Sequence, residues 1–452
     1  MLSLNNIIAY IKGGSERSRN IKKNAIGAIA VKIIAMAIQL LQVPIVLSYL
    51  DSTLYGLYLT ITSIVVWTHN FDFGLGSGLR YKLTEAIANK DYDRGKTLVS
   101  TSYISLAGIM LTVAICLIPA VHFFNWRDIL NCNELPNSYL STCVIVVLAT
   151  LLIQFVLELI TIVLQANQRA AISTVFKPLS NVVALIGVIV LKYTNEPSLL
   201  AACLMLTAPL VIVLLTANII LFMRKYRHIA PSLKYYRTSV MKDIYSLGVK
   251  FFITSLSGVI VYNSTSIIIS HYLNPFEVTV YNIAYTYFSL FVVFHGVFLT
   301  PVWAGITDAW VKKDIPWLRA CMKRIAMLTA VFSLFIIIAL CISKFAFHIW
   351  IGDKVSIPGI LSTWLALYFV LNLWSATYNC FVVGVGKAQL SMYLSFFKII
   401  AFIPMLIAAV NYYGLIGVVI ATILINTIPN VLFGYLQYNR LINNKATGVL
   451  NK

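Results

Sequence analysis

Charged side chains interrupt long apolar stretches of this 452-residue chain at five positions: Lys32, Asp72, Glu158, Lys250 and His295. A charged group inside hydrocarbon costs free energy unless it finds a partner or water, so we expect these side chains to face the protein interior. Lysines there suit an anionic group such as a phosphate, and a carboxylate or imidazole can carry a coupling proton. Asp72, Glu158 and His295 are therefore our candidates for ion coupling, with Arg80 and Lys82 expected at the mouth of the same interior.

Each charged position also has a structural interpretation that the sequence leaves open. Lys32 and Glu158 suit a fixed ion pair, since both lie ~10 Å from the same membrane face at 1.5 Å per residue. Long basic side chains near helix ends also snorkel to lipid headgroups. Snorkelling is the alternative for Lys250, Arg80 and Lys82, helix capping is the alternative for Asp72 and His295, and Lys177 and Lys398 are expected to be snorkelling anchors.

Uncharged polar and aromatic side chains form further stripes at helical spacing. Such a lining suits a cavity that passes sugars, because hydroxyl groups need both donors and acceptors and tyrosine rings can stack on sugar faces. The alternative is that the stripes only bond helix to helix, at ~0.6 kcal/mol each. The candidate lining residues are Gln39, Gln42, Gln154, Thr254, Ser257, Tyr281, Tyr285, Asn372 and Asn379.

The elements that carry these residues are membrane helices. The chain is 60% apolar and only 11% charged, whereas soluble domains carry roughly 25% charged residues. Apolar runs recur at the ~20-residue length that a helix needs to cross a bilayer. This composition excludes a soluble enzyme, a nucleic-acid binder and a disordered chain. The net charge of +19 fits cytoplasmic loops that face anionic lipid.

Twelve spans are predicted, and the basic residues orient them. With a cytoplasmic N-terminus, 29 of the 34 Lys and Arg residues lie on the cytoplasmic side, four lie on the other side and Lys32 lies within a span. This bias follows the positive-inside rule and places both termini in the cytoplasm. The expected spans are 24–48, 54–78, 97–121, 138–164, 171–191, 198–222, 247–270, 276–303, 322–343, 357–384, 388–410 and 413–437.

The two halves of the chain resemble each other. At an offset of 223, Lys90-Asp91 falls on Lys313-Asp314, and near 218, Arg169-Ala170 falls on Lys387-Ala388. Because each half holds an even number of spans, the copies run in the same direction, as in transporters whose substrate site lies between repeats. The expected domains are a basic segment (1–23), an N-lobe of six helices (24–222), a cytoplasmic linker (223–246), a C-lobe of six helices (247–437) and a tail (438–452).

Catalytic and cofactor motifs are missing from the sequence. Gly384-Val385-Gly386-Lys387 lacks the spacing and the hydroxyl of an ATP-binding phosphate loop. The seven cysteines form no Cys-x-x-Cys pair that would suggest a metal or redox site. The largest loop outside the membrane, 121–137, is short for an enzyme that joins glycans. We therefore expect a non-enzymatic protein that needs no cofactor or metal.

At this point the sequence resembles a known group of membrane proteins. Twelve spans in parallel halves, a basic N-terminus and a basic loop between the halves resemble bacterial polysaccharide flippases. The particular similarity is to O-antigen flippases of the Wzx type, in the superfamily of multidrug, oligosaccharidyl-lipid and polysaccharide (MOP) exporters. It rests on Ile45-Val-Leu-Ser-Tyr-Leu-Asp-Ser-Thr-Leu-Tyr-Gly-Leu-Tyr58, on Asp72-Phe-Gly-Leu-Gly76 and on Arg169.

The resemblance implies an activity and a fold. The fold would be all-α, with twelve transmembrane helices in two six-helix lobes around a central cavity, as in multidrug and toxic-compound extruders (MATE). The protein would move an undecaprenyl-pyrophosphate-linked oligosaccharide to the periplasmic leaflet of the inner membrane by alternating access, coupled to protons or sodium. It could associate with other polysaccharide-assembly membrane proteins, and no nucleic acid is expected. By analogy, Lys32, Arg80, Lys82 and Lys250 would hold the pyrophosphate.

Two other functions remain open. A multidrug extruder of the same fold would be expected to have an acidic, more apolar cavity, and the lysines argue against it. A membrane enzyme of glycan assembly is disfavoured by the short outside loops. The sequence leaves open the sugar composition, the coupling ion, the polysaccharide class, the oligomeric state and the resting conformation.

Overall fold

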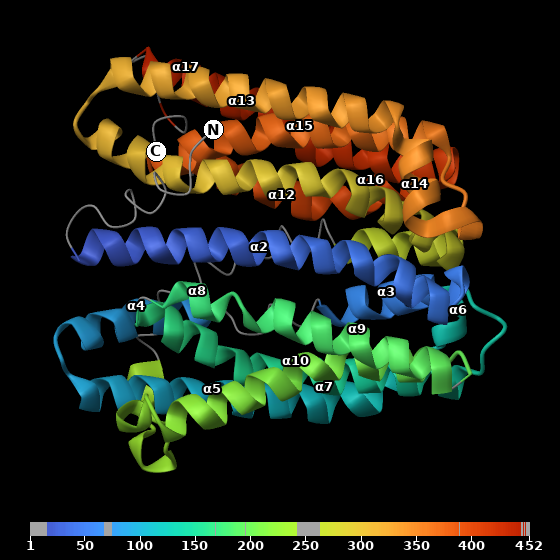
Figure 1. The fold of residues 1–452 in the computed structure, drawn as a ribbon, viewed down its shortest axis with the longest axis horizontal. Coiled ribbons are helices and arrows are strands. Elements are labelled where there is room, and N and C mark those ends of the chain that lie inside the picture. Colours follow the sequence, from blue (N-terminus) through green and yellow to red (C-terminus); the bar gives the residue numbers. More distant parts are fainter. Residues whose placement is uncertain are drawn as a thin grey trace. The chain divides into compact units, whose positions relative to one another are not determined.

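The computed structural model describes residues 16–66, 75–167, 169–194, 196–241, 263–387, 389–443, 446 and 448 (Figure 1). Every regular element in these ranges is a helix, and they contain no strand. Helices are stable in the hydrocarbon of a membrane, because a helix satisfies its own backbone hydrogen bonds where no water is available. Eight helices within the described ranges are long and apolar enough to cross a membrane. The prediction of an all-α polytopic membrane protein is confirmed.

The twelve predicted spans are consistent with this structure. Spans two and seven run partly through residues outside the described ranges, and many side chains in the first part of span one are not described, so these three spans are not among the eight long helices. The last two spans are contained in one continuous stretch, Gln389–Ile442. That stretch is broken at Gly414, whose backbone is non-helical at φ 59° and ψ −140°. Glycine tolerates a positive φ because it has no Cβ. The break lies close to the predicted boundary between spans eleven and twelve.

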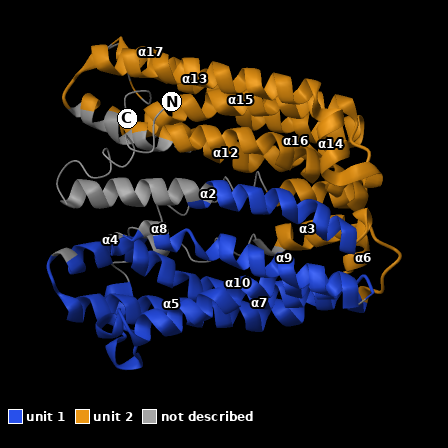
Figure 2. Ribbon diagram, viewed as in Figure 1, with its two compact units in different colours: residues 1–49, 68–124, 138–253 blue, residues 50–67, 125–137, 254–452 orange. Residues whose placement is uncertain are grey.

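The chain divides into two compact units (Figure 2). Unit 1 comprises residues 1–49, 68–124 and 138–253. In it α9 packs against both α2 and α10, α4 packs against α5, and the two short 3-10 helices cover α5. Its elements are α2 (Glu16–Tyr49), α4 (Leu75–Ala88), α5 (Tyr92–Val121), α7 (Asn137–Ala166), α8 (Ala170–Ser173), α9 (Phe176–Thr194), α10 (Leu199–Met223), η2 (Arg227–Ile229) and η3 (Leu233–Tyr235).

Unit 2 comprises residues 50–67, 125–137 and 254–452. Its centre is α12, which packs against α3, α13 and α15, while α15 also packs against α16 and α17. A helix over 263–272 precedes α12. The other elements are α3 (Ser52–Val66), α6 (Trp126–Leu130), α12 (Pro275–Val311), α13 (Ile315–Cys341), α14 (Ser343–Ile351), η4 (Gly352–Lys354), α15 (Gly359–Gly384), α16 (Gln389–Thr422), the π-helical segment η5 (Ile423–Thr427) and α17 (Ile428–Ile442). The lobe boundaries expected from the sequence stay predictions.

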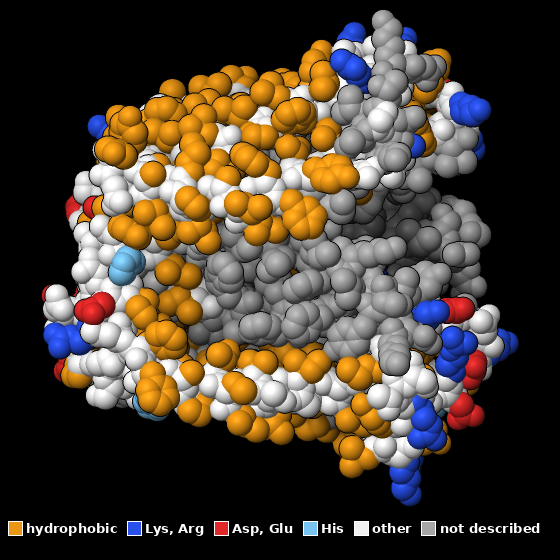
Figure 3. All heavy atoms as spheres, turned by 180° about the vertical axis from the view of Figure 1, so that it is seen from behind, with side chains coloured by type: hydrophobic (Ala, Val, Ile, Leu, Met, Phe, Trp, Pro, Cys, Tyr) orange, Lys and Arg blue, Asp and Glu red, His pale blue; other side chains and the backbone are white. Residues whose placement is uncertain are grey.

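Apolar side chains cover the outside of the helices in each unit. Ile115 on α5 and Ile349 on α14 are both about two-thirds exposed. On the face drawn in Figure 3, hydrophobic side chains cover the middle of the helices, and most Lys and Arg side chains gather near one end. Such a surface is stable in lipid, where apolar side chains carry no cost and basic residues meet the headgroups.

The internal repeat is visible as the same turn in both units. Lys90 and Lys313 both adopt a positive φ, at 57° and 58°. The next residue donates its N–H to a carbonyl five positions earlier, from Asp91 to Ala86 and from Asp314 to Ala309, at 2.9 Å in each case. The corresponding residues of the two turns (Lys90 and Lys313, Asp91 and Asp314, Ala86 and Ala309) are each 223 positions apart. The offset found in the sequence therefore has a structural counterpart.

The second sequence match also has a structural counterpart. The N–H of Arg169 donates to the carbonyl of Leu164 at 2.9 Å, and the N–H of Lys387 donates to the carbonyl of Val382 at 3.1 Å. These are the six-to-one bonds that commonly close a helix C-terminus. Both pairs are related by an offset of 218. The equivalent helices α7 and α15 therefore end with the same type of backbone hydrogen bond.

Candidate functional site

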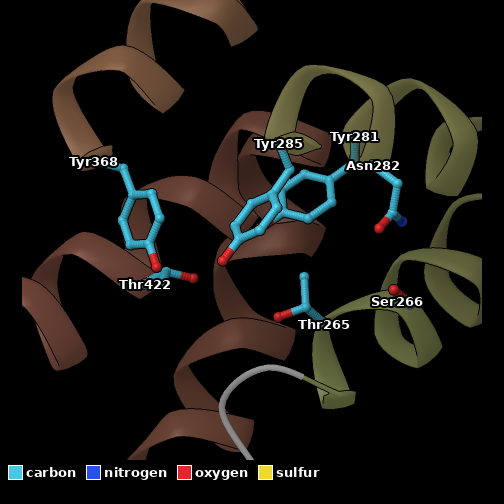
Figure 4. Close-up of a pocket in the computed structure, with 7 residues that line it drawn as sticks. All are labelled: Thr265, Ser266, Tyr281, Asn282, Tyr285, Tyr368 and Thr422. Carbon is cyan, nitrogen blue, oxygen red and sulfur yellow. The ribbon is translucent and has the colours of Figure 1, made fainter. Parts of the chain in front are cut away.

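Unit 2 contains a cavity of about 120 Å³ whose described lining residues each carry a hydroxyl or amide group (Figure 4). Four elements supply the lining: the helix over 263–272, α12, α15 and the end of α16. Three of these residues are tyrosines, and none of the described lining residues is charged. The lining residues are Thr265, Ser266, Tyr281, Asn282, Tyr285, Tyr368 and Thr422.

The three tyrosines form one aromatic group across two helices. Tyr281 and Tyr285 are one turn apart on α12, and their ring centroids lie 5.7 Å apart. Tyr285 lies 6.2 Å from Tyr368 of α15 and 4.9 Å from Phe369. Tyr281 and Tyr368 are both buried. Figure 4 shows the Tyr285 and Tyr368 hydroxyls turned toward the space between these helices.

This chemistry suits neutral, hydroxyl-rich molecules better than ions. Tyrosine and threonine hydroxyls can both donate and accept hydrogen bonds, which matches the requirement of a sugar hydroxyl. Aromatic rings add large apolar faces beside these polar groups. None of the described lining residues is a carboxylate that would attract an organic cation. Its chemistry therefore matches the lining expected for Tyr281 and Tyr285, although their contact with a sugar stays a prediction.

Of the seven described lining residues, Tyr281 and Tyr285 are among the candidates from the sequence. Thr265, Ser266 and Thr422 line the cavity, although none belonged to a predicted stripe. Thr422 donates its hydroxyl to the carbonyl of Val418 at 2.8 Å, in its own helix. It is the last residue of α16, directly before the π-helical segment. A single threonine at a helix irregularity gives no periodic signal, and so only the structure identifies it.

His295 is completely buried in unit 2, where it joins three helices. Its Nε2 atom lies 2.9 Å from Oγ1 of Thr329 on α13. That oxygen lies 2.7 Å from Oγ1 of Thr377 on α15. The other ring nitrogen, Nδ1, is buried without a hydrogen-bond partner among the described residues. A neutral ring satisfies this geometry, whereas a second N–H would have no acceptor here. Its role in ion coupling stays a prediction.

A hydrogen-bond network links α5, α7 and α10 in unit 1, near the predicted polar stripe of α7. Tyr103 donates its hydroxyl to Oδ1 of Asn218 at 2.7 Å, and Asn218 Nδ2 donates to the carbonyl of Leu157 at 2.8 Å. The next residue, Glu158, is half-buried, and Gln154 is buried one turn earlier. These two candidates therefore lie on a helix whose backbone is bonded to Asn218 of α10, and Asn218 is in turn bonded to α5.

Arg80 and Lys82 are placed on α4 of unit 1. Arg80 is exposed and donates from Nη1 to Oε1 of Gln165 on α7 at 3.3 Å. The ammonium of Lys82 lies 3.5 Å from the carboxylate of Glu85, one turn away. A partly exposed ion pair of this kind contributes ~0–1 kcal/mol. The guanidinium of Arg80 is exposed at this end of α4.

The remaining candidates differ in what the structure describes. Gln39 and Asn379 are exposed, and Gln42 is half-buried. Asn372 is half-buried, and its Nδ2 donates to the Tyr368 hydroxyl at 3.5 Å. Lys32 lies on α2, and its side chain is not described. Asp72, Lys250, Thr254 and Ser257 lie outside the described residues.

One expectation about a basic residue is wrong. Lys398 was expected to snorkel toward lipid headgroups, but only 7% of its surface is exposed. Its ammonium donates to Oδ1 of Asn430 on α17 at 2.8 Å. The side chain is therefore directed into unit 2. Its counterpart in the first turns of α9, Lys177, is exposed, as a snorkelling anchor would be.

Comparison with known proteins identifies the family. Residues 21–304, well over half of the chain, match the family described as polysaccharide biosynthesis protein. The chain belongs to this family. It is 22% identical over 361 residues to a putative O-antigen transporter of Salmonella typhimurium, covering 77% of this chain and 80% of that protein. A putative O-antigen export protein of Yersinia pseudotuberculosis is 23% identical over 403 residues, covering 85% and 88%.

A solved structure confirms the fold of this family member. An inward-facing multidrug resistance MATE family transporter of the MOP superfamily superposes with a TM-score of 0.76 at 17% identity. The match covers 93% of this chain and all of that one. At this identity the likeness shows the fold alone. The family match to polysaccharide biosynthesis proteins and the MATE transporter fold both agree with the resemblance drawn from the sequence.

Proposed function

We propose that this protein is a flippase for a lipid-linked oligosaccharide in the bacterial inner membrane, with both termini in the cytoplasm. It would move undecaprenyl-pyrophosphate-linked repeat units of O-antigen or a similar polysaccharide from the cytoplasmic to the periplasmic leaflet. Family membership and the names of the relatives support this class of cargo. The observation that carries the proposal is the uncharged, tyrosine-lined cavity of unit 2, whose donors and acceptors suit sugar hydroxyls.

The pyrophosphate needs cationic partners, and the sequence supplies them on the cytoplasmic side. We assign this role to Lys32, Arg80, Lys82 and Lys250. Arginine binds phosphate oxygens in a fork, and lysine binds them as a point charge. The exposed guanidinium of Arg80 supports this assignment, because its bond to Gln165 is to a neutral amide and not to a carboxylate.

Transport by alternating access would need a source of energy, and a proton or sodium gradient is our candidate. Asp72, Glu158 and His295 are the titratable side chains assigned to this coupling. Glu158 supports the idea because it is half-buried and follows Leu157, whose carbonyl accepts a hydrogen bond from Asn218 of α10. The proposal makes the protein a transporter rather than an enzyme of glycan assembly.

Deletion of the gene, followed by glycan analysis, tests this function. The flippase predicts loss of surface polysaccharide, with lipid-linked repeat units retained on the cytoplasmic side. Wild-type protein should restore the polysaccharide. Lys32→Ala should fail to do so at an unchanged protein level. Normal polysaccharide combined with increased dye sensitivity would contradict the proposal and favour a multidrug extruder of the same fold.

A further inference from the structure

Lys398 is a buried cation that the proposed transport cycle has not used. It lies nine positions after the start of α16 at Gln389, which is ~13 Å along a helix that rises 1.5 Å per residue. Only 7% of its surface is exposed. Its ammonium bonds to the side-chain oxygen of Asn430 at 2.8 Å. An ionisable side chain held this way inside a membrane protein is a candidate functional group, because its burial is costly.

The described helices around Lys398 offer it no negative charge. The described elements that pack against α16 are α15, the π-helical segment and α17. Neither α16 nor these three elements contain Asp or Glu. The ammonium therefore bonds to a neutral amide, and burial of a charge without an opposite charge beside it is unfavourable. Besides Lys398, the titratable residues on these elements are Tyr368, Tyr378, Cys380, Tyr393, Tyr412, Tyr413, Tyr435, Tyr438 and Arg440.

The partner of Lys398 lies beside a helix irregularity that leads to the hydroxyl-lined cavity. Asn430 follows the π-helical segment Ile423–Thr427 by three residues. Thr422, at the other end of that segment, lines the cavity. π-Helical turns are rare and occur frequently at functional sites, since they are places where a helix can change its register. The Lys398–Asn430 bond and the cavity wall are thus joined through one adjustable turn.

We propose that Lys398 is a further proton-exchanging group, beside the coupling candidates Asp72, Glu158 and His295, and that transport is coupled to a proton gradient only when Lys398 can titrate. Releasing one proton from the ammonium to water converts a costly buried cation into a neutral amine. Taking one proton from water on the other side of the membrane restores the cation. The change in the bond to Asn430 is passed through the π-helical segment to Thr422 and the cavity. This proposal rests on the proposed flippase function.

The test uses the full-length protein in liposomes that contain lipid-linked oligosaccharide and a trapped pH dye. Flipping and proton movement are recorded together. We expect the wild type to move protons as it flips its substrate. Lys398→Met, which removes the titratable group but keeps an apolar chain of similar length, should flip substrate down its gradient while proton movement falls to that of empty liposomes. Lys398→Arg should also lose proton movement, because arginine keeps its proton at all accessible pH values.

Matched variants separate proton exchange from a structural role. Lys177→Met changes the exposed counterpart on α9 and should leave both signals at wild-type levels. Asn430→Asp keeps the lysine but gives it a permanent counter-ion, so proton movement should be lost even if Lys398→Met folds poorly. Folding is checked for each variant by its thermal unfolding in detergent.

The possible outcomes distinguish a failure of the coupling proposal from a failure of the proposed flippase function. If the wild type flips substrate without moving protons, or if Lys398→Arg moves protons like the wild type, the coupling proposal is overturned and the flippase stands. If Lys398→Arg keeps both flipping and proton movement, the role of Lys398 is that of a fixed positive charge, such as a lysine that binds an anion. If the wild type flips no substrate, the proposed function fails, and the coupling proposal fails with it.

Discussion

Asp91 and Asp314 begin the helices α5 and α13 with the same hydrogen bond, although they lie 223 positions apart in the chain. Oδ1 of each aspartate accepts the backbone N–H three residues later, from Arg94 and from Trp317, at 3.0 Å in both cases. The residue before each aspartate is a lysine with a positive φ. Two units that keep the same turn, capping side chain and unusual backbone angle have the local structure expected of a duplicated element.

Removing either cap should therefore weaken its own helix. Asp91→Ala and Asp314→Ala should each lower the free energy of unfolding by about 1 kcal/mol, because an N-cap side chain satisfies a backbone donor that otherwise has no partner. Thermal unfolding in detergent measures the loss. Lys90→Gly is the matched control, since glycine adopts a positive φ without a steric cost and should leave stability unchanged or raised. Equal unfolding temperatures for the wild type and both alanine variants would contradict the capping role.

Gly56 marks the closest approach of α3 to α12. A Cβ added there would collide with the backbone carbonyl of Pro275. Thr279, one turn further along α12, donates its hydroxyl to the carbonyl of Ser52 at 2.6 Å. Gly56→Ala should therefore push the two helices apart and destabilise the protein by more than the ~1–3 kcal/mol typical of overpacking.

A matched glycine on α12 isolates that effect. An added Cβ at Gly296 meets no atom within 4 Å. Gly296→Ala should therefore unfold at or slightly above the wild-type temperature, since alanine is the better helix former. Expression level and thermal unfolding in detergent compare the two variants. A Gly56→Ala protein as stable as Gly296→Ala would show that α3 and α12 do not pack this closely.

Much of this architecture could be predicted from residue spacing, because a membrane fixes both the length and the polarity of each span. The pair Tyr281 and Tyr285, four residues apart, placed two rings on one face of a helix, and both line the cavity. Lys398 was mistaken for a snorkelling anchor because its position near a helix start gives its depth but not the direction of its side chain. Asn430 and Thr422 were missed, since the rotation of one helix against the next leaves no periodic signal in the sequence.

The tyrosines of the unit 2 cavity should affect transport more than stability. Tyr285→Phe and Tyr368→Phe each remove one hydroxyl while keeping the ring, so the aromatic packing at 6.2 Å is preserved. A lost sugar hydrogen bond costs about 0.5–1.5 kcal/mol, so we expect flipping at low substrate concentration to fall several-fold. Tyr435→Phe on α17, outside the cavity, serves as the control. Wild-type rates in both cavity variants would remove this cavity from the sugar path.

The buried hydroxyl of Tyr226 in unit 1 predicts that the stability of the protein is sensitive to alkali. It follows α10, and its hydroxyl is buried without a hydrogen-bond partner among the described residues. Burial raises its pKa, and nearby Arg169 lowers it in part. An unfolded tyrosine ionises near pH ~10. The neutral form stabilises the fold below that pH, and this contribution is lost as the pH rises through the higher folded-state pKa.

Tyr226→Phe tests that contribution. The variant should lose less stability than the wild type when the pH rises above about 10, because it has no phenol to ionise. At neutral pH it should unfold at the same or a slightly higher temperature, since an unsatisfied buried hydroxyl has been removed. Thermal unfolding across the alkaline range gives the answer. Identical alkaline profiles would show that the Tyr226 hydroxyl is not buried in the folded protein.

The most direct test of the central claim is a leaflet assay with purified protein. Liposomes are prepared with and without the protein, and a membrane-impermeant reagent modifies only oligosaccharide exposed on the outer leaflet. If the protein is a flippase, it should raise the fraction of undecaprenyl-pyrophosphate-linked oligosaccharide that the reagent can reach from about half toward all of it. In liposomes without the protein, the accessible fraction should stay at about half. An accessible fraction that is the same with and without the protein would contradict the flippase function.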